Sequence, residues 1–152
     1  MKELIIGCDN AAVGLKETLK NFLTGKGYHV EDIGCADETD VTFYPYIAER
    51  VCQAVKDSGF TKEGILLCGT GMGMAISANK IPGIRAAVCH DSYSAERAKL
   101  SNNANILCMG ARVIGPELAK QLAVEWLSLE FTDGPSTPKV HAVQELESRY
   151  LA

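Results

Sequence analysis

The sequence predicts an α/β fold with a five-stranded parallel sheet, on two observations. Short apolar runs alternate with longer segments in which apolar residues recur at helical spacing, which is typical of parallel strands joined by helical crossovers. The chain has 152 residues, of which 47% are hydrophobic and 22% charged, an ordinary composition for a globular protein. This length suits one domain with its own core, so we expect a single domain over residues 1–152.

Five apolar runs are the expected strands. Each is short enough for a buried strand and ends in glycine, cysteine or a polar residue. The runs are "LIIGC" (4–8), "YHVEDIG" (28–34), "GILLC" (64–68), "IRAAVC" (84–89) and "NILCMG" (105–110).

The segments between these runs carry the start and stop residues of helices. An apolar face spans residues 15–23, and a second helix is expected to start near Pro45 and stop at Gly59. Asp91 precedes "SYSAERAKL" and is the expected N-cap of another helix. Pro116 opens "PELAKQLAVEWLSLE", in the first-turn position that proline favours.

The last part of the chain is expected to leave the domain. "FTDGPSTPK" (131–139) is rich in glycine, proline and serine and predicts an extended loop. An amphipathic helix follows, with one apolar face made by Val140, Val143, Leu146 and Tyr150. A terminal helix reached through such a loop has little of its own domain to cover. We therefore expect residues 131–152 to form a dimer interface, with the helix packed on a partner subunit.

Charge and composition exclude several classes of protein. The formal net charge is −4, which argues against nucleic acid as a partner. No run approaches the roughly 18 apolar residues of a membrane span, and no signal peptide precedes the first strand, so we expect a cytoplasmic protein without a membrane partner. The six cysteines form no Cys-x-x-Cys pair and the three histidines are far apart, so we expect neither a metal nor another cofactor.

Polar residues follow four of the expected strands. Asp9 and Asn10 follow the first, Cys68 ends the third, His90 follows the fourth, and Arg112 follows the fifth. Any one of them alone is equally well explained as a cap or a turn residue. In open parallel sheets, however, ligands bind beyond the carboxyl ends of the strands. Four coincident strand ends therefore predict a site at this edge.

The loop "CGTGMG" is the most informative part of this edge. Gly69, Gly71 and Gly73 alternate after a strand, so backbone N–H groups can converge on an oxyanion. The spacing matches neither the dinucleotide fingerprint nor the P-loop. A thiol at Cys68 beside such donors has its thiolate favoured, and Thr70 supplies a hydroxyl next to it. The alternative is close packing around a buried, inert thiol.

Several motifs together resemble one enzyme family. "GCDN", "YPY" (44–46), "CGTGMG", "ANKIPGIRAAVCHD" (78–91) and "NNANILCMGARVIGPELA" are similar to ribose-5-phosphate isomerase B and the galactose-6-phosphate isomerase subunits. The resemblance covers about residues 3–130. It implies a Rossmann-like three-layer sandwich, metal-independent exchange of aldose and ketose phosphates, and a site built between the subunits of a homodimer or tetramer.

The resemblance also implies roles for individual residues. Cys68, assisted by Thr70, is the base that moves a proton between C1 and C2 of the sugar, while the glycine loop holds the enediolate. Arg112 binds phosphate, Asp9 binds sugar hydroxyls, and Asn102 comes from the partner chain. The expected substrate-binding set is Asp9, Asn10, Tyr44, Gly69, Gly71, Gly73, His90, Ser101, Asn102, Arg112 and Lys139.

The chain departs from the family pattern at several of these positions. Asn10 and Ser101 stand where the family usually has histidine, and neither titrates near pH 7. The histidine replaced by Ser101 is credited with opening the sugar ring, which leaves His90 as the remaining titratable candidate. Pro135 and Lys139 replace two arginines of the family's phosphate clamp, and lysine keeps the charge but loses the bidentate geometry.

Three functions remain open on these grounds. The first is a sugar-phosphate isomerase of the ribose-5-phosphate isomerase B type. The second is an isomerase for another sugar phosphate, either a hexose 6-phosphate or a tetrose 4-phosphate, which cannot close a five-membered ring and needs no ring opener. The third is a non-catalytic partner subunit, against which the retained Cys68 argues. A nucleotide-binding module is less well supported because no base or ribose fingerprint occurs.

Overall fold

The computed structural model describes residues 2–151 and confirms the expected α/β alternation. All five expected strands are present, and the second, fourth and fifth are shorter than expected. The strands are β1 (Glu3–Cys8), β2 (His29–Asp32), β3 (Glu63–Cys68), β4 (Ala86–Val88) and β5 (Ile106–Gly110). The helices are α1 (Val13–Gly25), α2 (Tyr44–Asp57), α3 (Met72–Ala78), α4 (Ser92–Leu100), α5 (Pro116–Ser128) and α6 (Thr137–Tyr150).

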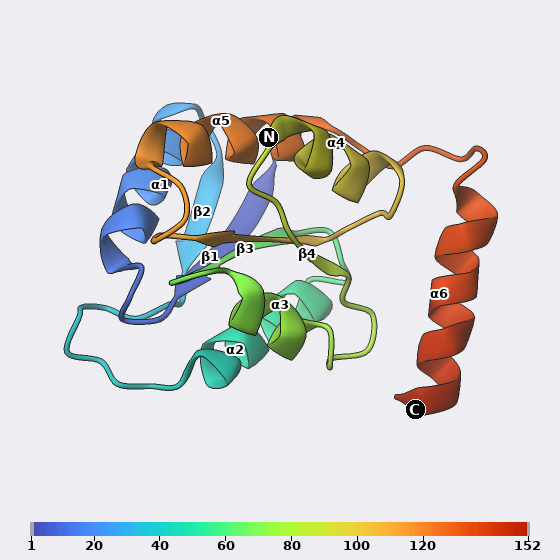
Figure 1. Cartoon of the computed structure of the whole chain (residues 1–152), viewed down its shortest axis with the longest axis horizontal. Coiled ribbons are helices and arrows are strands. Elements are labelled where there is room, and N and C mark those ends of the chain that lie inside the picture. Colours follow the sequence, from blue (N-terminus) through green and yellow to red (C-terminus); the bar gives the residue numbers. More distant parts are fainter. Residues whose placement is uncertain (1, 152) are drawn as a thin grey trace.

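The strands form one parallel sheet in the order β2-β1-β3-β5-β4. Helices α1, α4 and α5 cover one face, and α2 and α3 cover the other, so the molecule is a three-layer sandwich of the Rossmann-like kind (Figure 1). The central strands β1, β3 and β5 are apolar and almost wholly buried, as expected for strands covered on both faces. The six cysteines are all unpaired and buried within this core.

The expected helix starts are confirmed by the structure. The carboxylate of Asp91 accepts a hydrogen bond from the backbone N–H of Ser94 at 2.7 Å and so caps α4. Pro45 and Pro116 stand in the first turns of α2 and α5, where a missing N–H costs nothing.

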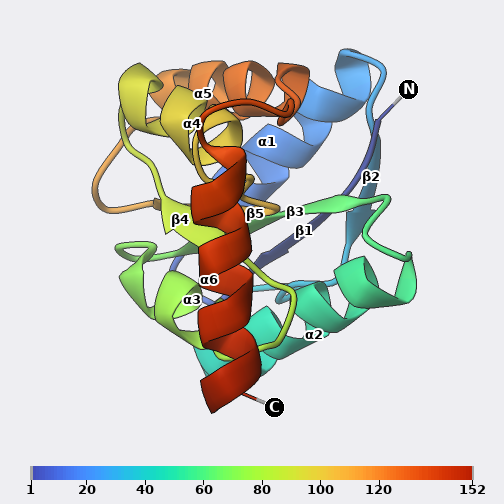
Figure 2. The same ribbon diagram turned by 90° about the vertical axis from the view of Figure 1, so that its right-hand side faces the viewer.

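Helix α6 lies apart from the two helical layers, beside the edge strand β4 (Figure 2). It begins at Thr137, so the extended loop expected over residues 131–139 is shorter than predicted. The reason is Pro138, which fits the first turn of a helix as well as it fits a loop. Val140 is buried and the carboxylate of Glu147 accepts the backbone N–H of Gly83 at 2.9 Å. These contacts hold α6 beside its own chain.

The rest of the apolar face of α6 is exposed to solvent. Val143 and Leu146 are about half exposed and Tyr150 is 79% exposed. Within residues 2–151, no helix has the length and apolar character needed to cross a membrane.

Candidate active site

Three of the predicted site residues lie together beyond the carboxyl ends of β1, β3 and β5. Cys68 ends β3 and is paired in register with Gly110 at the end of β5. The N–H of Asp9 donates to the carbonyl of Leu67 at 3.2 Å, and the N–H of Arg112 donates to the carbonyl of Gly69 at 3.0 Å. These bonds fix Asp9 and Arg112 on either side of Cys68.

The loop after β3 directs a hydrogen-bond donor at the thiol. The backbone N–H of Gly71 donates to Sγ of Cys68 at 3.1 Å. Gly71 has φ +79°, and a Cβ there would lie 3.0 to 3.2 Å from the backbone of Met109. Only glycine fits this left-handed position without strain. The loop therefore aims a backbone hydrogen-bond donor directly at the sulfur of Cys68.

The other cysteines are in a different environment. Desolvation raises the pKa of Cys8 and Cys52 to about 12 and of Cys35 and Cys89 to about 11. Burial also raises the pKa of Cys108 well above its ordinary value. These five side chains are therefore neutral thiols at neutral pH and serve as small apolar core residues. Cys68 is 5% exposed, whereas the other five are exposed by 1% or less.

Two larger side chains enclose the glycine loop. A Cβ at Gly69 would lie 3.2 Å from Nη1 of Arg112, and a Cβ at Gly73 would lie 2.5 Å from the ring of Tyr44. The guanidinium and the phenol ring are thus packed directly against the loop backbone. Thr70 is exposed beside them, and its hydroxyl accepts the N–H of Met72 at 3.3 Å.

Asp9 and Asn10 occupy the turn after β1. One carboxylate oxygen of Asp9 accepts the backbone N–H of Ala11 at 3.0 Å, so the side chain does hold a turn. Its other carboxylate oxygen accepts no hydrogen bond within the part of the chain described. Asn10 is exposed next to it. Over residues 2–151, no group of three or more His, Cys, Asp or Glu side chains is placed to hold a metal ion.

His90 is near this edge, but one ring nitrogen is already engaged. Its Nε2 accepts the backbone N–H of Gly110 at 2.8 Å. Burial lowers the pKa of His90, with the charge of Asp91 acting in the opposite direction. The imidazole is therefore neutral at neutral pH, with its proton on Nδ1, and Nε2 is unavailable for proton transfer while this bond lasts.

Ser101, Asn102 and Lys139 are not brought to Cys68 within one chain. Helix α4 starts after the carboxyl end of β4 and runs back antiparallel to the strands. Ser101 and Asn102, which follow it, therefore lie toward the amino ends of the strands. The Ser101 hydroxyl accepts a hydrogen bond from the guanidinium of Arg97 at 3.1 Å. Lys139 is exposed in the first turn of α6, which lies beside β4 at the sheet's edge.

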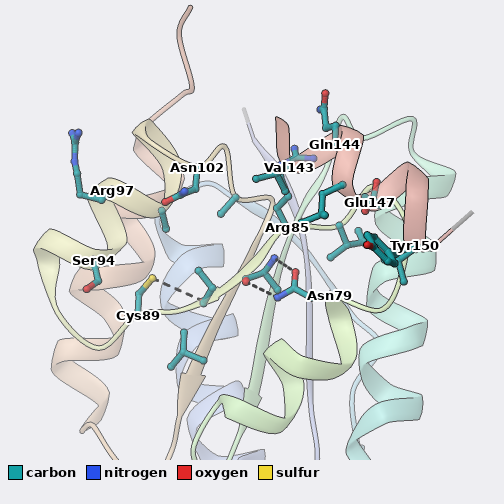
Figure 3. Close-up of a pocket in the computed structure, with 18 residues that line it drawn as sticks. Asn79, Arg85, Cys89, Ser94, Arg97, Asn102, Val143, Gln144, Glu147 and Tyr150 are labelled. Carbon is teal, nitrogen blue, oxygen red and sulfur yellow. Dashed lines mark hydrogen bonds between the residues drawn. The ribbon is translucent and has the colours of Figure 1, made fainter. Parts of the chain in front are cut away.

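Asn102 faces a groove of about 800 Å³ between the β4 edge, α4 and α6 (Figure 3). Neither Cys68 nor the glycine loop lines this groove. Its lining is mainly apolar, with Ala86, Val88, Val143, Leu146 and Tyr150 among the residues that form it. The strand-end chemistry and this groove are therefore separate features of one chain.

The sequence did not identify the end of β5 as part of the site. A Cβ at Gly110 would lie 2.6 Å from the backbone of Thr70, and the backbone of Met109 packs closely against Gly71. The sequence shows Gly110 only as the last residue of an apolar run, so a glycine at the end of a buried strand was the one available indication of this close contact.

The structure thus places a thiol beside a glycine loop at the carboxyl ends of an open parallel sheet. The ribose/galactose isomerase family model matches residues 4–143, and the chain belongs to this family. It is 50% identical to D-erythrulose-4-phosphate isomerase of Pectobacterium atrosepticum, over 94% of this chain and 93% of that protein. It is 49% identical to ribose-5-P isomerase B of Listeria innocua, over 97% and 98%. The structure of ribose-5-phosphate isomerase B from Clostridium thermocellum matches with a TM-score of 0.92 and 41% identity, over 97% and 99% of the two chains. The chain is accordingly a sugar-phosphate isomerase, an intramolecular oxidoreductase.

Proposed function

We propose that Cys68 is the base of an aldose–ketose isomerase of the ribose-5-phosphate isomerase B type. The observation that carries this proposal is the N–H of Gly71, which points at Sγ of Cys68 from a loop that admits only glycine there. The thiolate removes the proton from the carbon next to the carbonyl, and the thiol returns it to the neighbouring carbon. The resulting isomerisation passes through an enediolate.

The neighbouring groups suit this chemistry. The N–H groups of the glycine loop lie next to the thiol and stabilise the negative charge of the enediolate oxygens. Arg112 packs on the loop and offers a planar pair of donors for the phosphate. The free carboxylate oxygen of Asp9 is an acceptor for sugar hydroxyls, and the hydroxyl of Thr70 assists Cys68.

Replacement of Cys68 tests this assignment. Cys68→Ala removes the base without adding volume, and loss of a general base typically costs about 10² to 10⁴ in rate. The variant should fold, bind sugar phosphate and lose turnover. Wild-type activity in this variant would show that another group moves the proton.

An open-chain tetrose 4-phosphate is the second candidate substrate. A pentose 5-phosphate closes to a furanose, so its isomerase gains from an acid and a base that open the ring. Neither Asn10 nor Ser101 titrates near pH 7, and Nε2 of His90 is engaged by Gly110. A tetrose phosphorylated on O4 has no hydroxyl placed for a five-membered ring. The similarity to the D-erythrulose-4-phosphate isomerase of Pectobacterium atrosepticum also favours a four-carbon substrate.

Relative kcat/KM values for D-erythrulose 4-phosphate and ribose 5-phosphate decide between the two. The tetrose proposal expects the higher value on the four-carbon substrate. It also expects Ser101→His to raise the pentose rate selectively, while Ser101→Asn, which adds a polar group that cannot titrate, leaves the ratio unchanged. Equal or better wild-type efficiency on ribose 5-phosphate would restore the pentose as the substrate.

We further propose that the enzyme is a cytoplasmic homodimer or tetramer with composite sites. The exposed apolar face of α6 and the groove beside β4 form a surface that a second copy can cover. In a two-fold contact each chain gives the other the same residues, so Asn102, Ser101 and Lys139 are free to enter the partner's site. Residues 131–152 then belong to the interface of a single-domain subunit. The six unpaired cysteines fit a reducing cytoplasm.

A further inference from the structure

The end of strand β5 depends on a side chain for one of its ladder bonds. Cys108 and Gly110 face β4, whereas Ala111 faces β3 and donates its N–H to the carbonyl of Cys68 at 2.9 Å. Strand β4 ends at Val88, and its last ladder bond runs from the N–H of Cys89 to the carbonyl of Cys108 at 3.1 Å. The buried N–H of Gly110 comes next along β5, and Nε2 of His90 accepts it in place of a main-chain carbonyl.

Gly110 is also the point at which β5 supports the loop that carries the thiol. A Cβ there would lie 2.6 Å from the backbone of Thr70 and 2.8 Å from the carbonyl oxygen of Gly69. The preceding residue, Met109, makes the same kind of close contact with Gly71. Because backbone meets backbone here, a movement of Gly110 displaces the loop and the N–H that it aims at Cys68.

We propose that His90 is a positioning residue, whose Nε2 holds Gly110 and thereby keeps the Cys68–Gly71 loop in its productive geometry. This inference rests on the proposed role of Cys68 in proton transfer. It replaces the expectation that His90 opens the sugar ring, because the nitrogen that would exchange a proton is used to hold the backbone.

The protonation state of His90 is consistent with this role. Nε2 accepts a hydrogen bond only when it carries no proton, and burial lowers the pKa of the ring. Loss of the acceptor leaves the buried N–H of Gly110 unpaired unless the end of β5 shifts to find water or another partner. A displacement of about 1 Å in an active site costs up to about 10² in rate.

Two substitutions separate positioning from proton transfer. His90→Leu removes the acceptor and keeps an apolar side chain, whereas His90→Gln keeps an oxygen acceptor but cannot titrate. We expect His90→Leu to lower kcat roughly 10- to 100-fold and to change KM by less than about threefold. His90→Gln should recover most of kcat. Hydrogen exchange at the Gly110 amide should be faster in the leucine variant and slow again in the glutamine variant.

A second readout needs no sugar phosphate. The rate at which iodoacetamide alkylates Cys68, assigned by mass spectrometry, should differ from the wild-type rate in His90→Leu and return to it in His90→Gln. His90→Ala is compared in parallel, so that a folding failure of the leucine variant leaves the comparison intact. If the wild type turned over no sugar phosphate, the proposed function would fail, whereas exchange at Gly110 and alkylation of Cys68 would still report on His90.

The opposite pattern would overturn the proposal. Equal loss of kcat in the glutamine and leucine variants, with slow exchange at Gly110 in both, would assign His90 to proton transfer or substrate contact. Unchanged exchange at Gly110 together with unchanged alkylation of Cys68 in the leucine variant would show that the hydrogen bond does not position the loop.

Discussion

Substitution of Gly71 by alanine tests the loop geometry around the thiol. An L-residue at φ +79° costs about 1–2 kcal/mol in backbone strain. The new methyl group would also lie 3.0 to 3.2 Å from the backbone of Met109, which cannot rotate away as a side chain can. We therefore expect Gly71→Ala to lose about 2–3 kcal/mol of unfolding free energy. Relief of this contact moves the N–H of residue 71 away from Cys68. Loss of one such donor typically costs about 10² to 10³ in kcat.

Gly59 offers a matched control for this substitution. It also has positive φ, +68°, but a Cβ there would meet nothing within 4 Å, and it follows α2 outside the strand-end site. Gly59→Ala should lose only the strain energy of about 1–2 kcal/mol and keep full activity. Urea unfolding, kcat/KM and the alkylation rate of Cys68 measure the three effects. If Gly71→Ala matched Gly59→Ala in stability and kept wild-type activity, the argument that the loop admits only glycine and orients the N–H would be wrong.

Two further predictions concern stability and assembly. Burial raises the pKa of Asp32, but hydrogen bonds from Lys16 and Lys20 together lower it by more, so the net shift is downward. The ionised carboxylate therefore contributes to folding stability above about pH 4, and this contribution is lost as the pH falls through the lowered pKa of the folded state. Asp32→Asn should therefore lose about 2–4 kcal/mol of unfolding free energy at pH 7, because the buried ammonium of Lys16 loses a partner. In urea unfolding, the difference in stability between variant and wild type should shrink below pH 4. A constant difference from pH 3 to 7 would contradict this. Leu146→Asp places a charge in the groove beside α6 and should lower both assembly, measured by sedimentation, and activity, measured by kinetics. Ser148 lies outside the groove lining, so Ser148→Asp should change neither assembly nor activity. An active monomeric wild type would refute the composite site.

The sequence predicted the elements well because their signals are local. Apolar runs of strand length, Pro116 in a first turn and Asp91 as an N-cap depend on neighbours within a few residues, and the structure has each of them. The loop before α6 was predicted too long because Pro138 is compatible with both a turn and a helix start. Local propensity does not distinguish these two states.

The site was predictable only in part. Strand-end position alone indicated that Asp9, Cys68 and Arg112 share one edge, since parallel strands end together. The bond between His90 and Gly110 and the contact between Gly110 and Thr70 join segments far apart in the chain, and no sequence pattern encodes them. The separation of Asn102 from Cys68 within one chain follows from the direction of α4, and the resemblance had already implied that Asn102 comes from the partner chain.

The central claim is that Cys68 moves a proton between two carbons through an enediolate. Its most direct test is isomerisation of D-erythrulose 4-phosphate and ribose 5-phosphate in deuterated water, with product deuterium located by NMR. The account predicts that any solvent deuterium that the wild-type enzyme incorporates lies on the carbon next to the product's carbonyl, and that Cys68→Ala neither converts substrate nor exchanges this hydrogen. Solvent deuterium at any other carbon of the product, or conversion or exchange at the wild-type rate in Cys68→Ala, would contradict it.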